Sequence, residues 1–319
     1  MRPLIHSKPT PHKVHQGGHI TGGEIINNEL DRGLFHGRET VFNNTELEDD
    51  SFGAIGGNQA NKSISERRLG ISLIIPAYNE ADRICRALDS YIPALDILNM
   101  QYEILVIIDG KDETQKIVEG YKNQKIRCYK YDNKLGRGGA ILKGFEVSTY
   151  SIVGYTDADG SLSPEDLPTL VGECAAYDCV VGSRWIHGSK WKTKEPLFNS
   201  LAGRIYNLLI RGMLGIPISD TEGGGKFFRG NVIDATLPKI KVTNRAFTAS
   251  LYYHVRSNRF SITEVPITWD HDGNTRMPIL KAIPIMFITL VGVRIMNLPF
   301  SSIIPHSVID FFSHKFATV

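Results

Sequence analysis

Two aspartates, Asp157 and Asp159, stand one residue apart between an apolar run and the sequence SPEDL, and carboxylates at this spacing can serve three kinds of site. A calcium loop of the EF-hand type is excluded, because the sixth and twelfth positions counted from Asp157 are Leu162 and Pro168, where that loop needs Gly and Glu. A general acid and base pair is possible if the strand breaks at the glycine and serine that follow. The most economical interpretation is Mg²⁺ or Mn²⁺ bridging a diphosphate, since these cations take carboxylate oxygens and share their other positions with water and phosphates. A plain turn ahead of a helix is the structural alternative.

A second candidate is the glycine-rich loop 133-NKLGRGGA-140. It is not a dinucleotide-binding loop, because Ile141 occupies the last glycine position, and it is not a Walker A loop, because Phe145 stands where the lysine should be. Glycines that open a helix nevertheless suit anionic oxygens, which backbone N–H groups and the helix dipole attract. Lys134 and Arg137 would add positive charge to such a site. A tight strand-to-helix turn with a solvated arginine is the alternative.

Two further segments bring charged side chains to the ends of predicted strands. Arg184 follows the apolar sequence VVGS, where its planar guanidinium would suit a phosphate unless it forms a surface ion pair. In 219-SDTEGGGKFF-228 three glycines permit either close approach to a ligand or a structural hairpin, and they would bring Asp220 and Lys226 nearby. His271, between two aspartates, is more typical of a capping residue than of a metal ligand.

These residues need a sheet to bring them together, and the sequence from Ile71 onward supplies one. Short β-branched runs alternate with helical patterns, which predicts an α/β domain with a mostly parallel, doubly wound sheet covered by helices on both faces. In such sheets ligands bind beyond the carboxyl ends of the strands. The predicted strands end at Pro76 to Glu80, at Asp109, at the glycine-rich loop and at Asp157. Four polar or glycine-rich strand ends predict one shared crevice.

The composition bounds the possible functions. The chain has 319 residues, 42% of them hydrophobic, and a formal net charge of only +2 without a long Lys/Arg run, which disfavours a nucleic-acid partner. Its four cysteines lack the spacing of a disulfide or zinc framework, and no apolar leader opens the sequence. We therefore expect the catalytic part to be cytosolic.

Three regions are expected along the chain. Residues 1–69 lack a sustained apolar period and are expected to form a flexible extension, residues 70–300 the catalytic domain and residues 301–319 a tail. The uncharged run 282–293 is too short to span a bilayer, which takes about 20 apolar residues. It is either a buried helix or an amphipathic helix at a membrane surface, where the flanking Lys281 and Arg294 would meet lipid phosphates.

Six segments together, in their order and rough spacing, resemble family 2 glycosyltransferases with the GT-A fold, a Rossmann-like α/β arrangement. They are IIPAYNE, the Asp109-Gly110 strand end, NKLGRGGA, YTDADG, VGSR and SDTEGGGKFF. Within that family the sequence is most similar to dolichyl-phosphate glucosyltransferases and dolichol-phosphate mannose synthases, from about Ile71 to Asn297. This resemblance covers more than two thirds of the chain.

On the donor side, the resemblance implies roles in holding a nucleotide sugar. The residues expected to hold the nucleoside are Pro76, Tyr78, Glu80 and Asp109, with Arg137 facing the diphosphate. Asp157 and Asp159 resemble the DxD motif of the family, whose carboxylates hold Mg²⁺ or Mn²⁺ on the donor.

On the acceptor side, Arg184 resembles the arginine that faces the transferred sugar or the acceptor phosphate, and Asp220 and Lys226 match the segment beside it. With Asp159 these are the expected catalytic residues. A phosphate monoester has a second pKa near ~6 and needs no strong base, whereas an alcohol acceptor would need one, for which Asp220 is the candidate. The sequence departs from the family pattern at three positions. Ile108 replaces the first acidic residue of the usual Asp-Asp-Gly, and Arg137 replaces a lysine. The aromatic residue that usually precedes the lysine at position 226 is missing.

The sequence thus predicts a metal-dependent, inverting glycosyltransferase that moves a hexose from a nucleotide-diphosphate sugar, UDP-glucose, to a polyprenyl or dolichyl phosphate. GDP-mannose is the alternative donor, and a soluble molecule the alternative acceptor. From a different class, a sugar nucleotidyltransferase would carry a longer glycine-rich loop after the first strand, where this chain has PAYNEAD. A binding protein with an inactive transferase fold is disfavoured by the intact aspartate pair. Since the transmembrane anchors of the family have no counterpart, we expect peripheral contact with the cytoplasmic face of a membrane.

Overall fold

The computed structural model describes residues 67–193, 197–240, 242–243, 246–270 and 279–297. The predicted tail, His271 and all of the predicted extension before Arg67 lie outside these described residues. The first strand begins at Arg68, so residues 68 and 69, which were predicted to belong to the extension, are part of the sheet.

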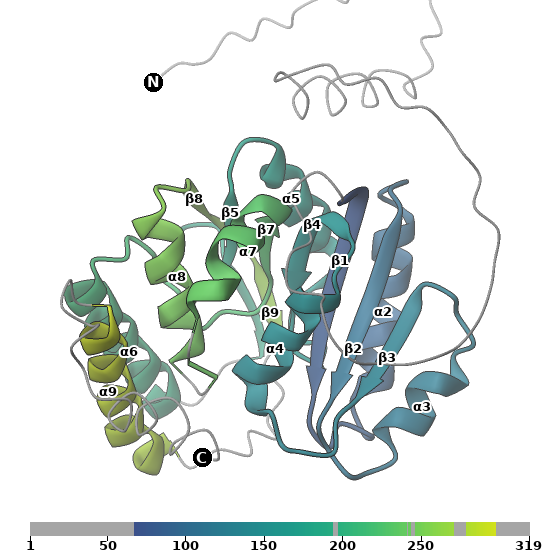
Figure 1. The fold of residues 1–319 in the computed structure, drawn as a ribbon, viewed down its shortest axis with the longest axis horizontal. Helices are drawn as coiled ribbons and strands as arrows, with labels where there is room; N and C mark the ends of the chain where they lie inside the picture. Colours follow the sequence, from purple (N-terminus) through teal and green to yellow (C-terminus); the bar gives the residue numbers. More distant parts are fainter. Residues whose placement is uncertain (1–66, 194–196, 241, 244–245, 271–278, 298–319) are drawn as a thin grey trace, which may run out of the picture. The chain divides into compact units, whose positions relative to one another are not determined.

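A sheet of seven strands forms the centre of the fold (Figure 1). Its strands, in spatial order, are β3 (Ile126–Lys130), β2 (Tyr102–Ile108), β1 (Arg68–Ala77), β4 (Tyr150–Tyr155), β7 (Lys226–Arg229), β5 (Cys179–Ser183) and β8 (Ile262–Pro266). All neighbours pair in parallel except β7, which runs antiparallel to both β4 and β5. A second sheet joins β6 (Lys190–Thr193) and β9 (Thr268–Asp270). The predicted mostly parallel sheet is confirmed.

Helices cover both faces of this sheet. They are α2 (Ile84–Asp96), α3 (Thr114–Gly120), α4 (Gly136–Val147), α5 (Leu167–Gly172), α6 (Leu197–Leu214), α7 (Gly230–Thr236), α8 (Phe247–Ser257) and α9 (Ile279–Met296), with short 3₁₀ turns at Pro164–Asp166, Glu173–Ala175 and Leu237–Lys239. Figure 1 shows α4, α7 and α8 on one face and α2 and α5 on the other. The doubly wound arrangement predicted from the alternating pattern is therefore present.

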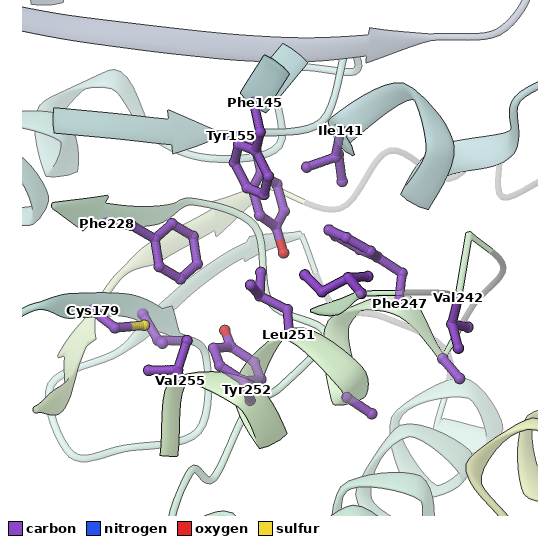
Figure 2. Packing of buried hydrophobic residues seen from close by; sticks show 14 of the residues in the cluster. Ile141, Phe145, Tyr155, Cys179, Phe228, Val242, Phe247, Leu251, Tyr252 and Val255 are labelled. Carbon is purple, nitrogen blue, oxygen red and sulfur yellow. The ribbon is translucent and has the colours of Figure 1, made fainter. Parts of the chain in front are cut away.

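The strand period of two explains why the sheet has a core on each face. In β1, Leu73 and Ile75 pack with the residues of α2 and α5, whereas Ile74 between them packs with those of α4 and α7. The core on the α4 side centres on aromatic rings, and Figure 2 shows Phe145 and Phe228 beside Tyr155. Their ring centroids lie 6.2 Å and 6.3 Å from that of Tyr155. A strand buried on both faces reads as a continuous apolar run, which is why ISLIIP was recognisable.

The C-terminal helix α9 packs beside α6 and α8. Leu290 and Val293 are fully buried there, but Phe287 and Ile288 are 46% and 38% exposed. Of the two alternatives for the run 282–293, a buried helix and a surface helix, α9 combines features of both. No helix among the described residues has the length and apolar character needed to cross a bilayer.

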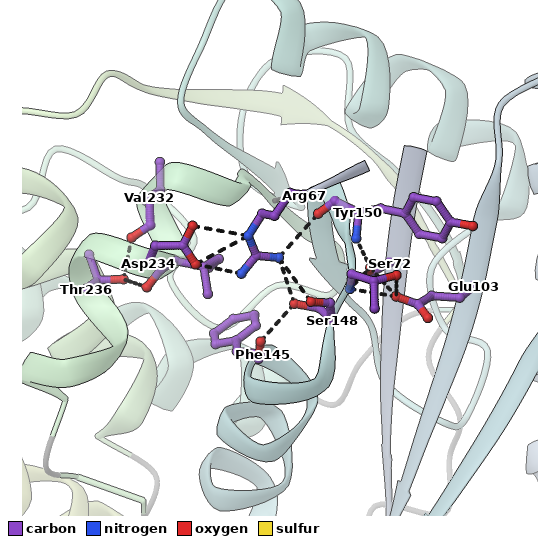
Figure 3. Close-up of polar contacts among 11 residues, drawn as sticks. Arg67, Ser72, Glu103, Phe145, Ser148, Tyr150, Val232, Asp234 and Thr236 are labelled. Carbon is purple, nitrogen blue, oxygen red and sulfur yellow. Dashed lines mark hydrogen bonds and ion pairs between the residues drawn. The ribbon is translucent and has the colours of Figure 1, made fainter. Parts of the chain in front are cut away.

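Arg67, the first described residue, forms polar contacts with α7 and with the connection between α4 and β4 (Figure 3). Its guanidinium pairs with Asp234 of α7, with Nη2 2.7 Å from Oδ1, and its Nη1 donates to Ser148 Oγ at 3.0 Å and to the carbonyl of Tyr150 at 3.3 Å. Both members of the ion pair are largely buried, with side chains 11% and 18% exposed. A buried ion pair is costly to break, because the remaining charge loses both its partner and water.

We expect Asp234→Ala to lower the free energy of unfolding by about 2–4 kcal/mol, since it leaves Arg67 without its carboxylate. Urea titration measures this difference. The matched control is Glu113→Ala, which removes the exposed pair between Glu113 and Lys116 and should cost less than about 0.5 kcal/mol. Equal losses in the two variants would show that the Arg67 contact does not stabilise the fold.

Candidate active site

The carboxyl ends of β1, β2 and β4 surround one cavity of about 230 Å³. It lies where β1 pairs with β2 on one side and with β4 on the other, so that the connections leave in opposite directions and open a crevice. All seven residues expected on the donor side line it. The complete lining consists of Pro76, Ala77, Tyr78, Glu80, Arg83, Asp109, Arg137, Ala140, Asp157, Ala158 and Asp159.

Asp109 holds the glycine-rich loop in place. Its Oδ2 accepts hydrogen bonds from the backbone N–H groups of Leu135 at 2.7 Å and Gly136 at 2.9 Å, at the start of α4. The carboxylate thus offsets the positive end of the helix dipole and orients the loop that carries Arg137. Asp109 is almost completely buried, and this contact gives it a positioning task in addition to the expected contact with the nucleoside.

Glu80 is paired with an arginine that the sequence analysis missed. Arg83 Nε donates to Oε2 and its Nη2 to Oε1, both at 2.7 Å, in a fork that occupies the whole carboxylate. Both residues line the cavity. The signal in the sequence was a Glu and an Arg three residues apart, directly after a strand end. The helix α2 begins only at Ile84, because the chain first turns at Asn79, where φ is +56°.

Tyr78 offers an aromatic surface at the rim of the cavity. It is 44% exposed, and Lys134 Nζ lies 4.6 Å from the centroid of its ring. An exposed ring with a cation over it suits a flat base, which stacks on aromatic side chains. The ring of Tyr78 and the carboxylates of Asp157 and Asp159 therefore line the same cavity.

Asp157 and Asp159 lie beyond the end of β4, in a turn that contains Gly160 at φ +67°. Because the strand has ended, both carboxylates line the cavity instead of pointing to opposite sides of the sheet. Arg137 Nε donates to Asp157 Oδ1 at 2.9 Å. Burial alone would raise the pKa of Asp157, but Arg137 outweighs it and lowers that pKa. Burial and the neighbouring charge of Asp157 raise the pKa of Asp159.

The donor set fits a hard divalent cation that relies on a substrate for its other ligands. Two neighbouring carboxylates repel one another when both are ionised, and this repulsion adds to burial in raising the pKa of Asp159. A cation between them would favour the ionised form of both. Among the described residues no group of three or more His, Cys, Asp or Glu side chains could hold a metal ion. Mg²⁺ and Mn²⁺ suit such a pair, since they keep several waters and bind substrate phosphates.

Arg184 and Asp220 form a buried ion pair next to this cavity. Arg184 Nε lies 2.7 Å from Oδ2 and Nη2 lies 2.9 Å from Oδ1, and the backbone N–H of Arg184 also donates to Oδ2 at 3.0 Å. Burial opposes ionisation of Asp220, but Arg184 outweighs it and the pKa of the carboxyl is lowered. A fully buried carboxylate with a lowered pKa and both oxygens bonded is poorly suited to act as a general base.

All three tryptophans of the chain gather around Arg184. Its Cζ lies 5.7 Å from the ring centroid of Trp185, 5.9 Å from that of Trp191 and 5.2 Å from that of Trp269. Trp191 and Trp269 face each other in the small sheet of β6 and β9. The spacing of the three tryptophans in the sequence does not indicate this cluster, which we call the tryptophan cage.

Lys226 lies beneath the cavity, not at its surface. It begins β7, is fully buried, and pairs in register with Tyr155 of β4. Its ammonium donates to the carbonyl of Gly223 and lies 5.2 Å from the ring centroid of Tyr155. Burial and then Arg137 lower the pKa of Lys226 to about 8, against the attraction of nearby carboxylates. Lys226 is a buried charge that supports the site from below.

The three glycines before Lys226 allow this close packing. A Cβ on Gly224 would lie 2.3 Å from the ring of Trp269, and Gly225 has φ +78°, a conformation that favours glycine. The sequence suggested either close approach to a ligand or a structural hairpin, and in the structure Gly224 packs closely against Trp269 of the chain itself.

We expect Asp220→Leu to destabilise the fold by about 3–5 kcal/mol, because it leaves Arg184 charged inside the tryptophan cage. The double variant with Arg184→Met should be more stable than Asp220→Leu alone. Urea titration followed by tryptophan fluorescence measures both values. Asp96→Leu is the control and should cost much less, because it removes a solvent-exposed carboxylate that pairs with Lys125 and accepts a hydrogen bond from Tyr102. A double variant less stable than the single one would contradict the pairing.

Lys226 also makes stability depend on pH. Its folded pKa of about 8 is lower than the usual 10.5, so between these values the unfolded chain holds more protons than the folded one. The contribution of Lys226 to the free energy of unfolding therefore rises across this window, by at most on the order of 3 kcal/mol. Urea titrations from pH 7 to 10 should show this rise as a difference between the wild-type protein and Lys226→Met. Parallel curves for the two proteins would contradict the shift.

The family described as "Glycosyl transferase family 2" matches residues 72–237. Among similar proteins, a dolichyl-phosphate beta-glucosyltransferase of Trichomonas vaginalis, ALG5C, is 30% identical over 70% of this chain and 70% of its own length. The dolichyl-phosphate beta-glucosyltransferase of Dictyostelium discoideum is 28% identical over 67% of this chain and 70% of its own. Glycosyltransferase AglD of Haloferax volcanii is 28% identical over 67% of this chain, but the match spans only 35% of that longer protein.

Solved structures show the same fold at low sequence identity. Glucosyl-3-phosphoglycerate synthase of Mycobacterium tuberculosis, in complex with Mn²⁺, UDP and phosphoglyceric acid, aligns with a TM-score of 0.54 at 17% identity, over 72% of this chain and 80% of its own. Mannosyl-3-phosphoglycerate synthase of Rubrobacter xylanophilus aligns with a TM-score of 0.55 at 16% identity, over 73% and 78%. With the sheet, the strand-end cavity and the family match in agreement, the chain belongs to glycosyl transferase family 2 and is a glycosyltransferase.

Proposed function

We propose that this glycosyltransferase moves a hexose, with inversion, from a nucleotide-diphosphate sugar to a polyprenyl phosphate, with UDP-glucose as the donor. The observation that carries the proposal is the cavity that Asp157, Asp159, Arg137 and the exposed Tyr78 line together. A carboxylate pair suited to a cation, a guanidinium and a stacking surface in one cavity support the binding of a nucleoside diphosphate. The two dolichyl-phosphate beta-glucosyltransferases among the relatives support the choice of glucose and of a polyprenyl phosphate.

The proposed reaction is a single displacement. An oxygen of the acceptor phosphate attacks the anomeric carbon, the bond from that carbon to the diphosphate oxygen breaks, and the electron pair leaves with the nucleoside diphosphate. Asp157 and Asp159 would hold Mg²⁺ or Mn²⁺, whose charge stabilises the diphosphate when the ion is bound. Arg137 offsets further negative charge on the same leaving group. The acceptor phosphate is already ionised above its second pKa of ~6, so it needs positioning and not a base.

The state of Asp220 favours a phosphate acceptor over an alcohol. Asp220 was the residue expected to serve as a base, and in the structure both of its oxygens are bonded to Arg184. Transfer to a phosphate oxygen does not require a base, because the phosphate is already ionised. A soluble acceptor is the second candidate, in line with the phosphoglyceric acid bound by a protein of the same fold. An acceptor that reacts through a hydroxyl group would need a base other than Asp220.

An apolar surface on α6 and α9 supports peripheral contact with a membrane. Leu201, Ile205 and Leu208 of α6 are 57%, 48% and 68% exposed, and they add to the exposed Phe287 and Ile288 of α9. Exposed large apolar side chains in such number mark an interaction surface. We place this surface on the cytoplasmic leaflet, where a polyprenyl phosphate would be presented to a cytosolic donor.

The transfer is tested by incubating the protein and Mn²⁺ or Mg²⁺ with radiolabelled UDP-glucose or GDP-mannose and a short polyprenyl phosphate, followed by counting the organic phase. Label is expected there with UDP-glucose, and EDTA should abolish it. Label with GDP-mannose alone would overturn the donor. Release of UDP without label in the lipid would overturn the acceptor, and transfer to phosphoglycerate in its place would establish the second candidate.

We expect Asp157→Asn and Asp159→Asn to lower kcat by about 100-fold or more, because each removes a charge that holds the cation at the leaving group. The midpoint of thermal unfolding should change little, since both residues lie in a turn beyond β4. Asp82→Asn, outside the cavity lining, is the control and should retain activity. Full activity of Asp159→Asn would show that the pair does not hold the cation.

A further inference from the structure

The exposed face of α6 contains an arginine, Arg204, among apolar side chains. Leu201, Arg204, Ile205 and Leu208 follow the spacing i, i+3, i+4 and i+7, which places them on one side of the helix. All four are exposed, whereas Tyr206 and Ile210 on the opposite side are buried. A charge within an exposed apolar stripe suits a ligand that carries both an apolar chain and a group of opposite charge.

Arg204 is held against the tryptophan cage. Its Cζ lies 5.3 Å from the ring centroid of Trp185, and Arg184 Cζ lies 5.7 Å from the same ring. A Cβ on the neighbouring Gly203 would come within 3.5 Å of that ring, so the helix backbone itself runs close to it. Stacking on an indole fixes the plane of a guanidinium and leaves its N–H groups at the edge for a ligand.

The two arginines on Trp185 differ in charge balance. Arg184 is neutralised by the buried carboxylate of Asp220. Arg204 forms no ion pair with any carboxylate of the described part of the chain. Of the two guanidinium groups near Trp185, that of Arg184 therefore belongs to a neutral pair, whereas that of Arg204 adds a positive charge beside the exposed apolar side chains of α6.

We propose that Arg204, stacked on Trp185, binds the phosphate of the polyprenyl phosphate acceptor, while Leu201, Ile205 and Leu208 contact its first isoprene units. This assignment rests on the proposed function and names the side from which the acceptor enters. A single phosphate at the end of an apolar chain matches one fixed guanidinium beside three apolar side chains. Binding to a bulk anionic bilayer, by contrast, depends on several basic residues spread over a surface, each contributing separately.

Arg204→Ala should raise the KM for a short prenyl phosphate, such as farnesyl phosphate in detergent, by roughly 10- to 100-fold, the worth of one charge-assisted hydrogen bond. The KM for the donor should stay within about twofold, because the donor cavity does not include Arg204. Arg204→Lys, which keeps the charge, should recover part of the affinity. The matched control is Arg211→Ala, two turns further along the exposed face of α6, which should leave the KM unchanged. An unchanged KM in Arg204→Ala, or an equal increase in both alanine variants, would overturn the assignment.

A binding measurement tests the same contact without turnover. Since all three tryptophans surround Arg184, farnesyl phosphate should change the intrinsic fluorescence of the wild-type protein, and Arg204→Ala should require roughly 10- to 100-fold more ligand for the same change. Inorganic phosphate should reproduce the change only weakly, because it lacks the chain. A response to anionic vesicles without prenyl phosphate that depends on Arg204 to the same degree would overturn the choice of ligand in favour of bulk lipid.

The two proposals can fail separately. If the wild-type protein transfers no sugar to any prenyl phosphate but binds farnesyl phosphate through Arg204, the reaction is wrong and the binding site stands. If transfer occurs with the same KM in Arg204→Ala, the reaction stands and the assignment of Arg204 is wrong.

Discussion

The site depends on the pairing of charges at the ends of its strands. Ionised side chains removed from water are tolerated only when they are paired, and three of them, Lys226, Asp220 and Arg184, lie close to the partly exposed pair of Arg137 and Asp157. The strand β7 makes this possible, because it runs antiparallel between β4 and β5 and starts with Lys226 opposite Tyr155. Without β7 the aspartates at the end of β4 and the arginine at the end of β5 would belong to separate strand ends.

The fold could be predicted because its signals are local. Strands buried on both faces appear as continuous apolar runs, and polar residues at their ends mark the crevice, so the residues from Pro76 to Asp159 were placed together without coordinates. The alternating pattern does not indicate where a turn delays a helix, as at Asn79, whose positive φ precedes the start of α2 at Ile84.

The parts that the sequence did not disclose all depend on contacts between distant segments. The tryptophan cage joins Trp185, Trp191 and Trp269, and the last of these approaches only through the pairing of β6 with β9. Whether Asp220 is a base or a structural partner is likewise decided by Arg184, 36 positions away. Arg83 differs, since its partner Glu80 is only three residues earlier, and this short spacing was a usable signal.

The two ion pairs of the site have opposite consequences for binding. Arg137 and Asp157 are 37% and 29% exposed, so water compensates for much of their attraction and the pair is cheap to separate. Arg184 and Asp220 are 12% and 0% exposed, and separating them would strand a charge. The pair of Arg137 and Asp157 can therefore exchange its internal contact for contacts with the proposed diphosphate and cation. The pair of Arg184 and Asp220 is neutral and buried beside the tryptophan cage, so under the proposed function the recognition of an incoming phosphate falls to charges outside this pair.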